Sequence, residues 1–114
     1  MCSKNVLKEI TERVCAAAKE VLGDKLKKVI LYGSYARGDY DEYSDIDIFV
    51  IADIAQEECC DAGLDILKFT RDLSLGHNIL ICPHVTGYET FLGWQNVLPF
   101  YMNVIKEGIE LYAA

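Results

Sequence analysis

The chain has 114 residues, of which 52% are hydrophobic and 25% charged, and its formal net charge is −7. This length suits one domain with a modest hydrophobic core. The acidic balance and the scattered Lys and Arg side chains argue against direct nucleic-acid binding and against anionic membranes.

No apolar run approaches the roughly 20 residues of a membrane span, and the N-terminus lacks a signal peptide. Five cysteines are odd in number and lack metal-site spacing. We therefore expect a cytoplasmic protein with reduced thiols, in preference to a disulfide or a zinc site.

Residues 3–22 have the apolar spacing of an amphipathic helix, with Ser3 as a plausible N-cap and Gly23-Asp24 at the end. The apolar positions recur at steps of three and four, and they are Leu7, Ile10, Val14, Ala17 and Val21. This pattern predicts a helix that covers one face of a sheet.

An apolar strand, 29–32, follows and stops at Gly33-Ser34, where a short helical turn through 35–37 closes at Gly38. Gly33 allows a tight turn and close approach to a ligand. Ser34 is placed to cap the turn, whose free N–H groups favour a phosphate. Arg37, one turn later, can reach an anion at the same mouth.

A second strand is predicted over 44–51, after an acidic loop. Side chains alternate along a strand, so Asp45 and Asp47 share one face while Ile46, Ile48 and Val50 share the other. Two carboxylates one pleat apart repel each other and resist burial. A divalent cation would make this arrangement favourable, which predicts a metal–triphosphate site.

The second half of the chain predicts four further elements. A sequence like a capping box, 53–56, opens a helix with the apolar stripe Cys59, Ala62, Ile66, Phe69 and Leu73, and Gly76 ends it. Residues 78–85 predict a strand that Pro83 marks as an edge. Pro99 begins a helix that Gly108 ends, and 109–112 finish as a short strand.

The tail carries a dense apolar group, formed by Trp94, Leu98, Phe100 and Tyr101. Core packing is the default interpretation of this group, and a partner surface is the second.

Gly33-Ser34, Ala36-Arg37-Gly38 and Asp45-Ile-Asp47, at this spacing, resemble the signature of the polymerase-beta-like nucleotidyltransferases. The chain as a whole resembles the minimal nucleotidyltransferases, small domains often found as antitoxins beside a HEPN-domain toxin. The strand signals and the two long amphipathic stripes predict an α/β (α+β) fold with a small mixed sheet of three to four strands and helices packed mainly on one face. The resemblance implies the polymerase-beta-like nucleotidyltransferase fold. Residues 1–114 would form one such domain.

The same resemblance implies Mg²⁺-dependent transfer of a nucleoside monophosphate, AMP from ATP in the first instance, to a hydroxyl of a partner HEPN toxin. Asp45 and Asp47 would be the catalytic residues and would hold two magnesium ions. Gly33, Ser34, Arg37 and Ser44 would bind ATP or another nucleoside triphosphate. Association of identical copies is a further possibility.

The chain departs from the family on the predicted third strand, where these enzymes commonly place a third carboxylate. No Asp or Glu occurs between His77 and Val85. Asn78 is a weak alternative ligand, and His77 or His84 an alternative base.

Two other functions are compatible with part of the pattern. A non-catalytic antitoxin would bind its toxin through an acidic and apolar surface, which fits the missing acid and the charge of −7. A calcium loop counted from Asp39 fails, because Val50 stands where the loop needs a Glu. Tyr40 and Tyr43 are candidates for stacking on a base.

Overall fold

The computed structural model describes residues 4–41 and 44–114, so the predicted N-cap Ser3 and the predicted base-stacking Tyr43 lie outside the described residues. In chain order the elements are α1 (Lys4–Leu22), the 3-10 turn η1 (Gly23–Lys25), β1 (Leu26–Tyr32), α2 (Ser34–Arg37), β2 (Ile46–Ala52), the 3-10 turn η2 (Gln56–Glu58), α3 (Cys59–His77), β3 (Ile81–Gly87), α4 (Tyr88–Trp94), α5 (Pro99–Glu107) and β4 (Ile109–Ala113).

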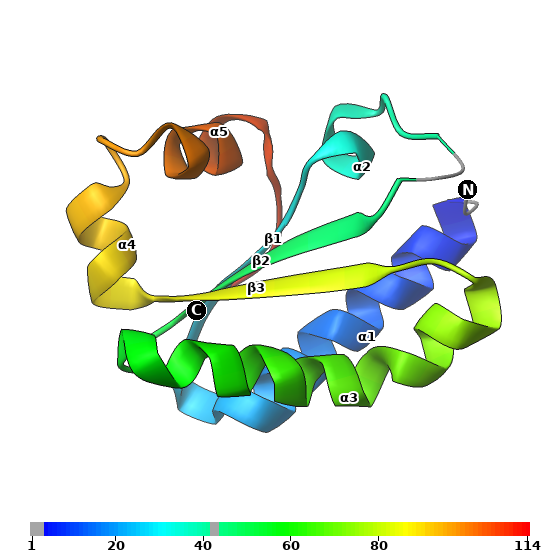
Figure 1. Cartoon of the computed structure of the whole chain (residues 1–114), viewed down its shortest axis with the longest axis horizontal. Coiled ribbons are helices and arrows are strands. Elements are labelled where there is room, and N and C mark those ends of the chain that lie inside the picture. Colours follow the sequence, from blue (N-terminus) through cyan, green and yellow to red (C-terminus); the bar gives the residue numbers. More distant parts are fainter. Residues whose placement is uncertain (1–3, 42–43) are drawn as a thin grey trace.

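The strands form one mixed sheet in the order β3-β2-β1-β4 (Figure 1). The central strand β1 pairs antiparallel with β2 and with β4, while β2 and β3 are parallel. This confirms the predicted α/β fold with a small mixed sheet. It also confirms that β3, which contains Pro83, is an edge strand.

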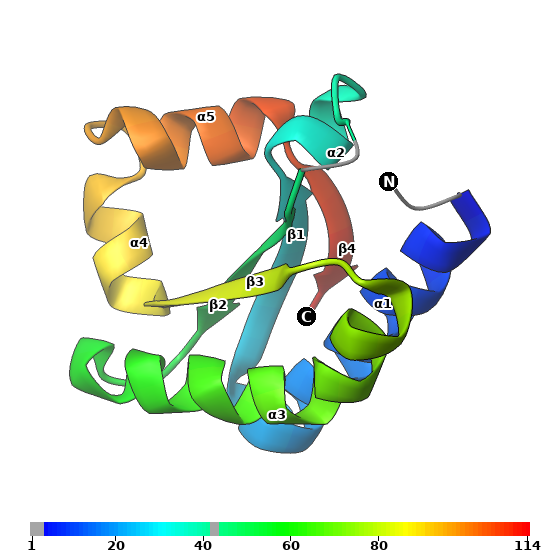
Figure 2. The same ribbon diagram turned by 45° about the vertical axis from the view of Figure 1, so that its right-hand side comes forward.

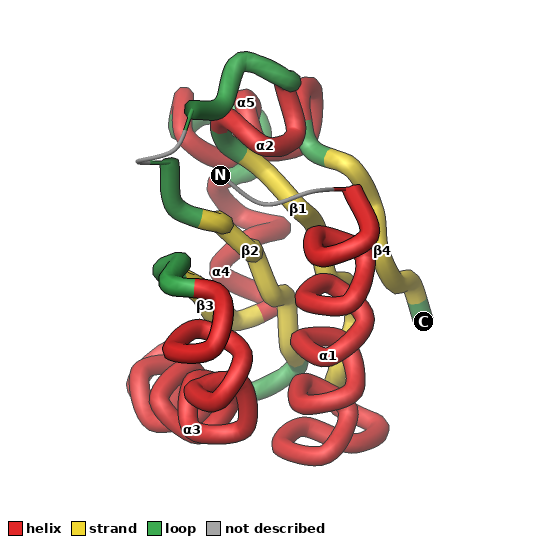
Figure 3. Tube along the Cα trace, turned by 90° about the vertical axis from the view of Figure 1, so that its right-hand side faces the viewer, coloured by secondary structure: helices red, strands yellow, loops and turns green. Residues whose placement is uncertain are grey.

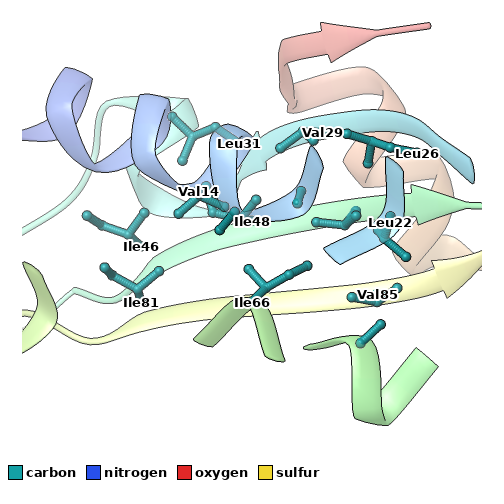
Figure 4. Close-up of a cluster of buried hydrophobic side chains, with 14 of the residues drawn as sticks. Val14, Leu22, Leu26, Val29, Leu31, Ile46, Ile48, Ile66, Ile81 and Val85 are labelled. Atoms are coloured by element: carbon teal, nitrogen blue, oxygen red, sulfur yellow. The ribbon is translucent and has the colours of Figure 1, made fainter. Parts of the chain in front are cut away.

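The two long helices α1 and α3 lie side by side on one face of the sheet (Figure 3). Their apolar stripes meet the inward side chains of β1, β2 and β3 in the larger core cluster (Figure 4). Ile10 and Val14 of α1 and Ile66 of α3 are fully buried there. An ion pair of 3.1 Å between Arg13 and Asp72 joins the two helices at their exposed side.

The opposite face is covered by α4 and α5, as Figures 1 and 2 show. Phe49 of β2 is fully buried at the centre of this second cluster. Its ring lies 5.9 Å from that of Phe91 in α4 and 5.7 Å from that of Tyr101 in α5. The prediction of helices mainly on one face was therefore wrong, because two short helices, of 7 and 9 residues, cover the other face.

The predicted elements are present, with displaced ends. Strand β2 begins at Ile46 and β3 at Ile81, each later than predicted, and α3 begins at Cys59. The capping box was wrong: the Gln56 side-chain oxygen instead accepts the N–H of Gly87 at 2.9 Å. Within α3 the predicted stripe fails at one position, since Phe69 is exposed and Thr70 is buried.

The apolar group of the tail was predicted to be part of the core, but three of its four residues are not buried. Tyr101 is buried, but Trp94, Leu98 and Phe100 are each more than a third exposed. Because α4 and α5 have only 7 and 9 residues, each presents a narrow side to the sheet and leaves its remaining apolar side chains in solvent.

No helix in residues 4–41 and 44–114 is long and apolar enough to cross a membrane.

The position of Phe49 predicts a large loss of stability on truncation. Phe49→Ala leaves a cavity between β2 and the α4–α5 layer and should lower the free energy of unfolding by about 3–5 kcal/mol. Phe69→Ala is the matched control, because that ring is 49% exposed and its removal opens no cavity. Urea unfolding of both variants measures the difference, and equal losses would contradict the assigned core.

Candidate active site

The turn after β1 is built on two glycines with positive φ. Gly33 (φ 77°, ψ −155°) is the N-cap of α2, and its carbonyl accepts the N–H groups of Ala36 and Arg37, each at 3.1 Å. Gly38 ends α2 in the left-handed conformation and donates its N–H to the carbonyl of Ser34 at 2.9 Å. The backbone of Gly33 is essentially restricted to glycine.

The Gly33 turn lies directly against the carboxylate of Asp47. A β-carbon at position 33 would be 2.6 Å from Oδ2 of Asp47, so only glycine leaves room for this side chain. The antiparallel register of β1 and β2 pairs Tyr32 with Asp47 and so brings the two segments together. The structure thus places two of the predicted site residues in contact.

Asp45 and Asp47 differ in their surroundings. Asp45 is exposed and precedes β2, whereas Asp47 is half-buried on the face that also carries Phe49. Burial raises the pKa of Asp47, the charge of Asp45 raises it further, and Arg37 lowers it. The repulsion predicted for the pair is therefore one cause of the raised pKa of Asp47.

Two neighbours of Asp47 also respond to its charge. Tyr32 lies opposite it on β1, and burial, then Asp47 and Cys82, raise the pKa of the phenol to about 12. Cys82 is its register partner on β3, and burial with the charges of Asp45 and Asp47 raises the pKa of that thiol. Both neighbours are therefore neutral at pH 7 and add no further negative charge.

Arg37 lies at the mouth of the site but is held by carboxylates. Its Nε donates to Asp39 at 3.2 Å, and its guanidinium lies 3.6 Å from Glu107 at the end of α5. A triphosphate would have to compete with these two partners for the guanidinium. Both ion pairs are exposed, so each is weak and readily exchanged.

The two predicted serines have structural positions that differ from those expected. Ser34 is the first residue of α2, and the cap position belongs to Gly33, because the close approach to Asp47 needs the glycine there. The Ser44 hydroxyl accepts the N–H of Asp41 at 3.0 Å and donates to the Asp41 carboxylate at 3.2 Å. Ser44 therefore fixes the loop before β2, and its role in nucleotide binding stays a prediction.

One of the candidate base-stacking tyrosines is already stacked within the protein. The rings of Tyr35 and Tyr40 lie 4.3 Å apart at an interplanar angle of 11°. One face of the Tyr40 ring is therefore covered by Tyr35, and this contact holds the loop against α2.

The residues considered in place of a third carboxylate fall in different places. His77 and Asn78 belong to the end of α3, where Asn78 is the left-handed C-cap and His77 lies 3.9 Å from Glu9. His84 lies on β3 against Phe49 and Phe100, and burial lowers its pKa. The position next to Asp47 on β3 is occupied by Cys82.

The carboxylate pair fits a magnesium ion carried by a nucleotide. Among the described residues, no group of three or more His, Cys, Asp or Glu side chains is arranged to hold a metal. Mg²⁺ commonly takes one or two protein carboxylates and completes its shell with phosphate and water oxygens. Two hard oxygen ligands that repel each other match this requirement.

Sequence reasoning missed Glu107 and Tyr32. Glu107 is seventy positions from Arg37 and meets it only through the packing of α5, which no local pattern indicates. Tyr32 could have been identified from the sequence. It is the last residue of the strand before Gly33, so it must lie near any residue that the turn contacts.

Comparison with known proteins shows the family to which the chain belongs. The model of the nucleotidyltransferase domain family matches residues 7–89, and the chain belongs to this family. A Methanocaldococcus jannaschii protein that is named as a candidate protein adenylyltransferase is 37% identical over 111 residues, which cover 95% of this chain and 99% of that protein.

Two solved structures share the fold at low sequence identity. One is described as a minimal nucleotidyltransferase, with a TM-score of 0.60 and 20% identity over 94% of each chain. The other is a tri-AMPylated HEPN toxin of Shewanella oneidensis in complex with its MNT antitoxin, with a TM-score of 0.52, 14% identity and coverage of 94% of this chain and 72% of that one. These likenesses confirm the polymerase-beta-like nucleotidyltransferase fold.

The contact between Gly33 and Asp47 predicts that a methyl group at position 33 disrupts the site. Gly33→Ala should weaken Mg-ATP binding at least about tenfold, or 1.4 kcal/mol, because the added carbon displaces the carboxylate. Gly38→Ala is the control: its φ is also positive, but its β-carbon would meet open space. It should cost about 1–2 kcal/mol of stability and keep its nucleotide affinity. Calorimetric titration of the two folded variants gives the comparison, and equal affinities would count against the site.

The raised pKa of Asp47 predicts a pH-dependent gain of stability in Asp47→Asn. The folded chain binds this proton more readily than the unfolded chain, so the ionised carboxylate destabilises the fold at pH values above its folded pKa. Asp47→Asn should therefore melt at a higher temperature than wild type at pH 7, and this advantage should shrink as the pH falls toward the ordinary value of 3.8. Melting curves of Asp53→Asn, an exposed residue beyond the same strand, provide the reference; a stability loss at pH 7 in Asp47→Asn would contradict the assignment.

Proposed function

We propose that the chain transfers AMP from Mg-ATP to a hydroxyl group of a partner protein, and that this partner is a HEPN-domain toxin. The observation that carries the proposal is the Asp47 carboxylate held against the Gly33 turn, with Asp45 beside it. Residues 1–114 would act as one minimal nucleotidyltransferase domain, in the cytoplasm, where ATP is available.

Each site residue has a proposed task. The Gly33-Ser34 turn and the Ser34 hydroxyl hold terminal phosphates, and Ser44 keeps the loop of Asp41 in place. Asp45 and Asp47 hold magnesium, which when bound offsets the negative charge of the triphosphate. Arg37 exchanges Asp39 and Glu107 for phosphate oxygens and so stabilises charge that develops during transfer.

The reaction forms a bond between the acceptor oxygen and the α-phosphorus while the bond to the departing pyrophosphate breaks. Positioning and charge compensation carry most of the catalysis in such transfers. His84 is the candidate base for the acceptor proton: it lies on the same sheet face as Phe49, and its lowered pKa keeps the imidazole neutral at pH 7.

The identity of donor and acceptor is supported by the relatives. The M. jannaschii protein is named for adenylyl transfer to protein. The S. oneidensis structure describes an AMPylated HEPN toxin together with an MNT antitoxin.

A second function is favoured by one specific observation. Cys82, and no carboxylate, stands next to Asp47 on β3. An antitoxin could bind nucleotide without turnover and neutralise its toxin by binding to it. Such a protein would need only the two aspartates and an acidic surface. The net charge of −7 suits a basic ribonuclease as its target.

Transfer is tested by incubating the chain with Mg-ATP and the product of the neighbouring reading frame, which we expect to be a HEPN-domain toxin, followed by intact-mass analysis. The toxin should gain AMP with wild type and remain unmodified with the Asp45→Asn/Asp47→Asn double variant, because that variant lacks both metal ligands. A parallel assay of toxin ribonuclease activity separates the two functions. Neutralisation without any mass change, retained in the double variant, would establish the blocking antitoxin and reject transfer.

A further inference from the structure

Exposed apolar side chains are concentrated on α4, α5 and the turn between them. Of the twelve large hydrophobic side chains that are exposed in the described residues, eight fall between positions 92 and 109. We call six of these the α4–α5 surface: Leu92, Trp94, Val97, Leu98, Phe100 and Met102, with exposed fractions from 38% to 61%. Contiguous apolar groups of this kind mark interaction sites.

The α4–α5 surface is free of charge in a strongly charged chain. Residues 92–105 contain no Asp, Glu, Lys, Arg or His, although a quarter of the whole sequence is charged. The charges that flank this stretch are Glu89 on α4 and Lys106, Glu107 and Glu110 at the other end, with a net charge of −2. In the fold, Lys27 also lies at this border, with its Nζ 5.4 Å from the ring centre of Tyr88 in α4, and Arg37 pairs with Glu107. The surface is therefore an apolar centre with charged residues of both signs around it, which is the usual arrangement of a protein interface.

The same surface is continuous with the candidate active site. The ring of Phe100 lies 5.6 Å from that of Tyr32, which is the residue paired with Asp47 across β1 and β2. At the end of α5, Glu107 contacts Arg37. Figure 2 shows the end of α5 next to α2. A protein seated on α4 and α5 would thus have side chains within reach of the Asp47 carboxylate.

We propose that the α4–α5 surface is the docking site for the acceptor-bearing protein, which presents to it an apolar face and carries a net positive charge. The inference rests on the proposed transfer to a partner protein and specifies where that partner binds. Docking here would place the acceptor hydroxyl beside the nucleotide without a separate acceptor-binding element.

Charge decides between this partner and a second copy of the chain. Two copies that face each other through this surface repel each other, because each copy carries a net charge of −7. A partner with a net positive charge is attracted to the chain instead. The apolar centre supplies affinity in both cases, so the net charges select the partner.

The test uses charged substitutions in the centre of the surface. Val97 is 61% exposed in the turn between α4 and α5, and Met102 is 47% exposed on α5, so Val97→Glu and Met102→Glu should fold normally. Both should weaken binding of the proposed partner, the product of the neighbouring reading frame, at least tenfold in calorimetric titrations. Affinity for Mg-ATP should stay at the wild-type value.

Two controls sharpen the result. Leu75→Glu changes a residue that is 76% exposed on α3, on the other face of the sheet, and should bind the partner within twofold of wild type. Val97→Lys should weaken binding more than Val97→Glu, because a basic partner repels the added lysine.

The outcomes separate this inference from the proposed function. Wild-type affinity for the partner in both Val97→Glu and Met102→Glu would overturn the docking site and leave transfer intact. No binding of the partner by wild type would reject the proposed partner, and the docking site with it. A wild-type dimer that Val97→Glu converts to a monomer, with partner binding unchanged, would assign the surface to a second copy and overturn the proposal.

Discussion

The close approach of the Asp47 carboxylate to the backbone of Gly33 is the constraint on which the site depends. It requires a residue without a β-carbon at the end of β1, and a register that sets Tyr32 opposite Asp47. It also requires a φ of 77° at Gly33, where the chain passes from β1 into α2. Since β1 and β2 are both central strands of the sheet, the proposed phosphate-binding turn and the proposed metal-binding strand are fixed by one pairing.

This arrangement leaves the free protein with excess negative charge at one point. Asp47 is half-buried and next to Asp45, so burial and repulsion both raise the free energy of its ionised carboxylate. Arg37 offsets part of that charge from a distance, while Asp39 and Glu107 hold its guanidinium. A bound cation would relieve the repulsion at the aspartates, and a triphosphate would give Arg37 a stronger anion than either exposed carboxylate. A cation would therefore compensate the charge of the aspartates, and a triphosphate would compensate the charge of Arg37. This difference favours binding of the two ligands together.

Local patterns predicted most of the elements but not the second face of the sheet. Helical periodicity located α1 and α3, and glycine and proline positions located the ends of α2 and α5, because these signals lie within a few residues of one another. The exposure of Trp94, Leu98 and Phe100 was not predictable, since it depends on how little of a short helix the sheet can cover. The contact of Glu107 with Arg37 and the position of Cys82 beside Asp47 likewise depend on strand order and helix placement.

The two faces of the sheet therefore have different physical roles. The face under α1 and α3 is closed by two 19-residue helices whose apolar stripes are almost fully buried. The other face has Phe49 as its centre, with short helices over one part and the aspartates at the end of the sheet where α2 begins. Tyr32 and Phe100 connect these two parts through ring contacts. The packing under α1 and α3 holds the strands in register. The face under α4 and α5 can therefore leave its carboxylates and its apolar side chains accessible without loss of the geometry between Gly33 and Asp47.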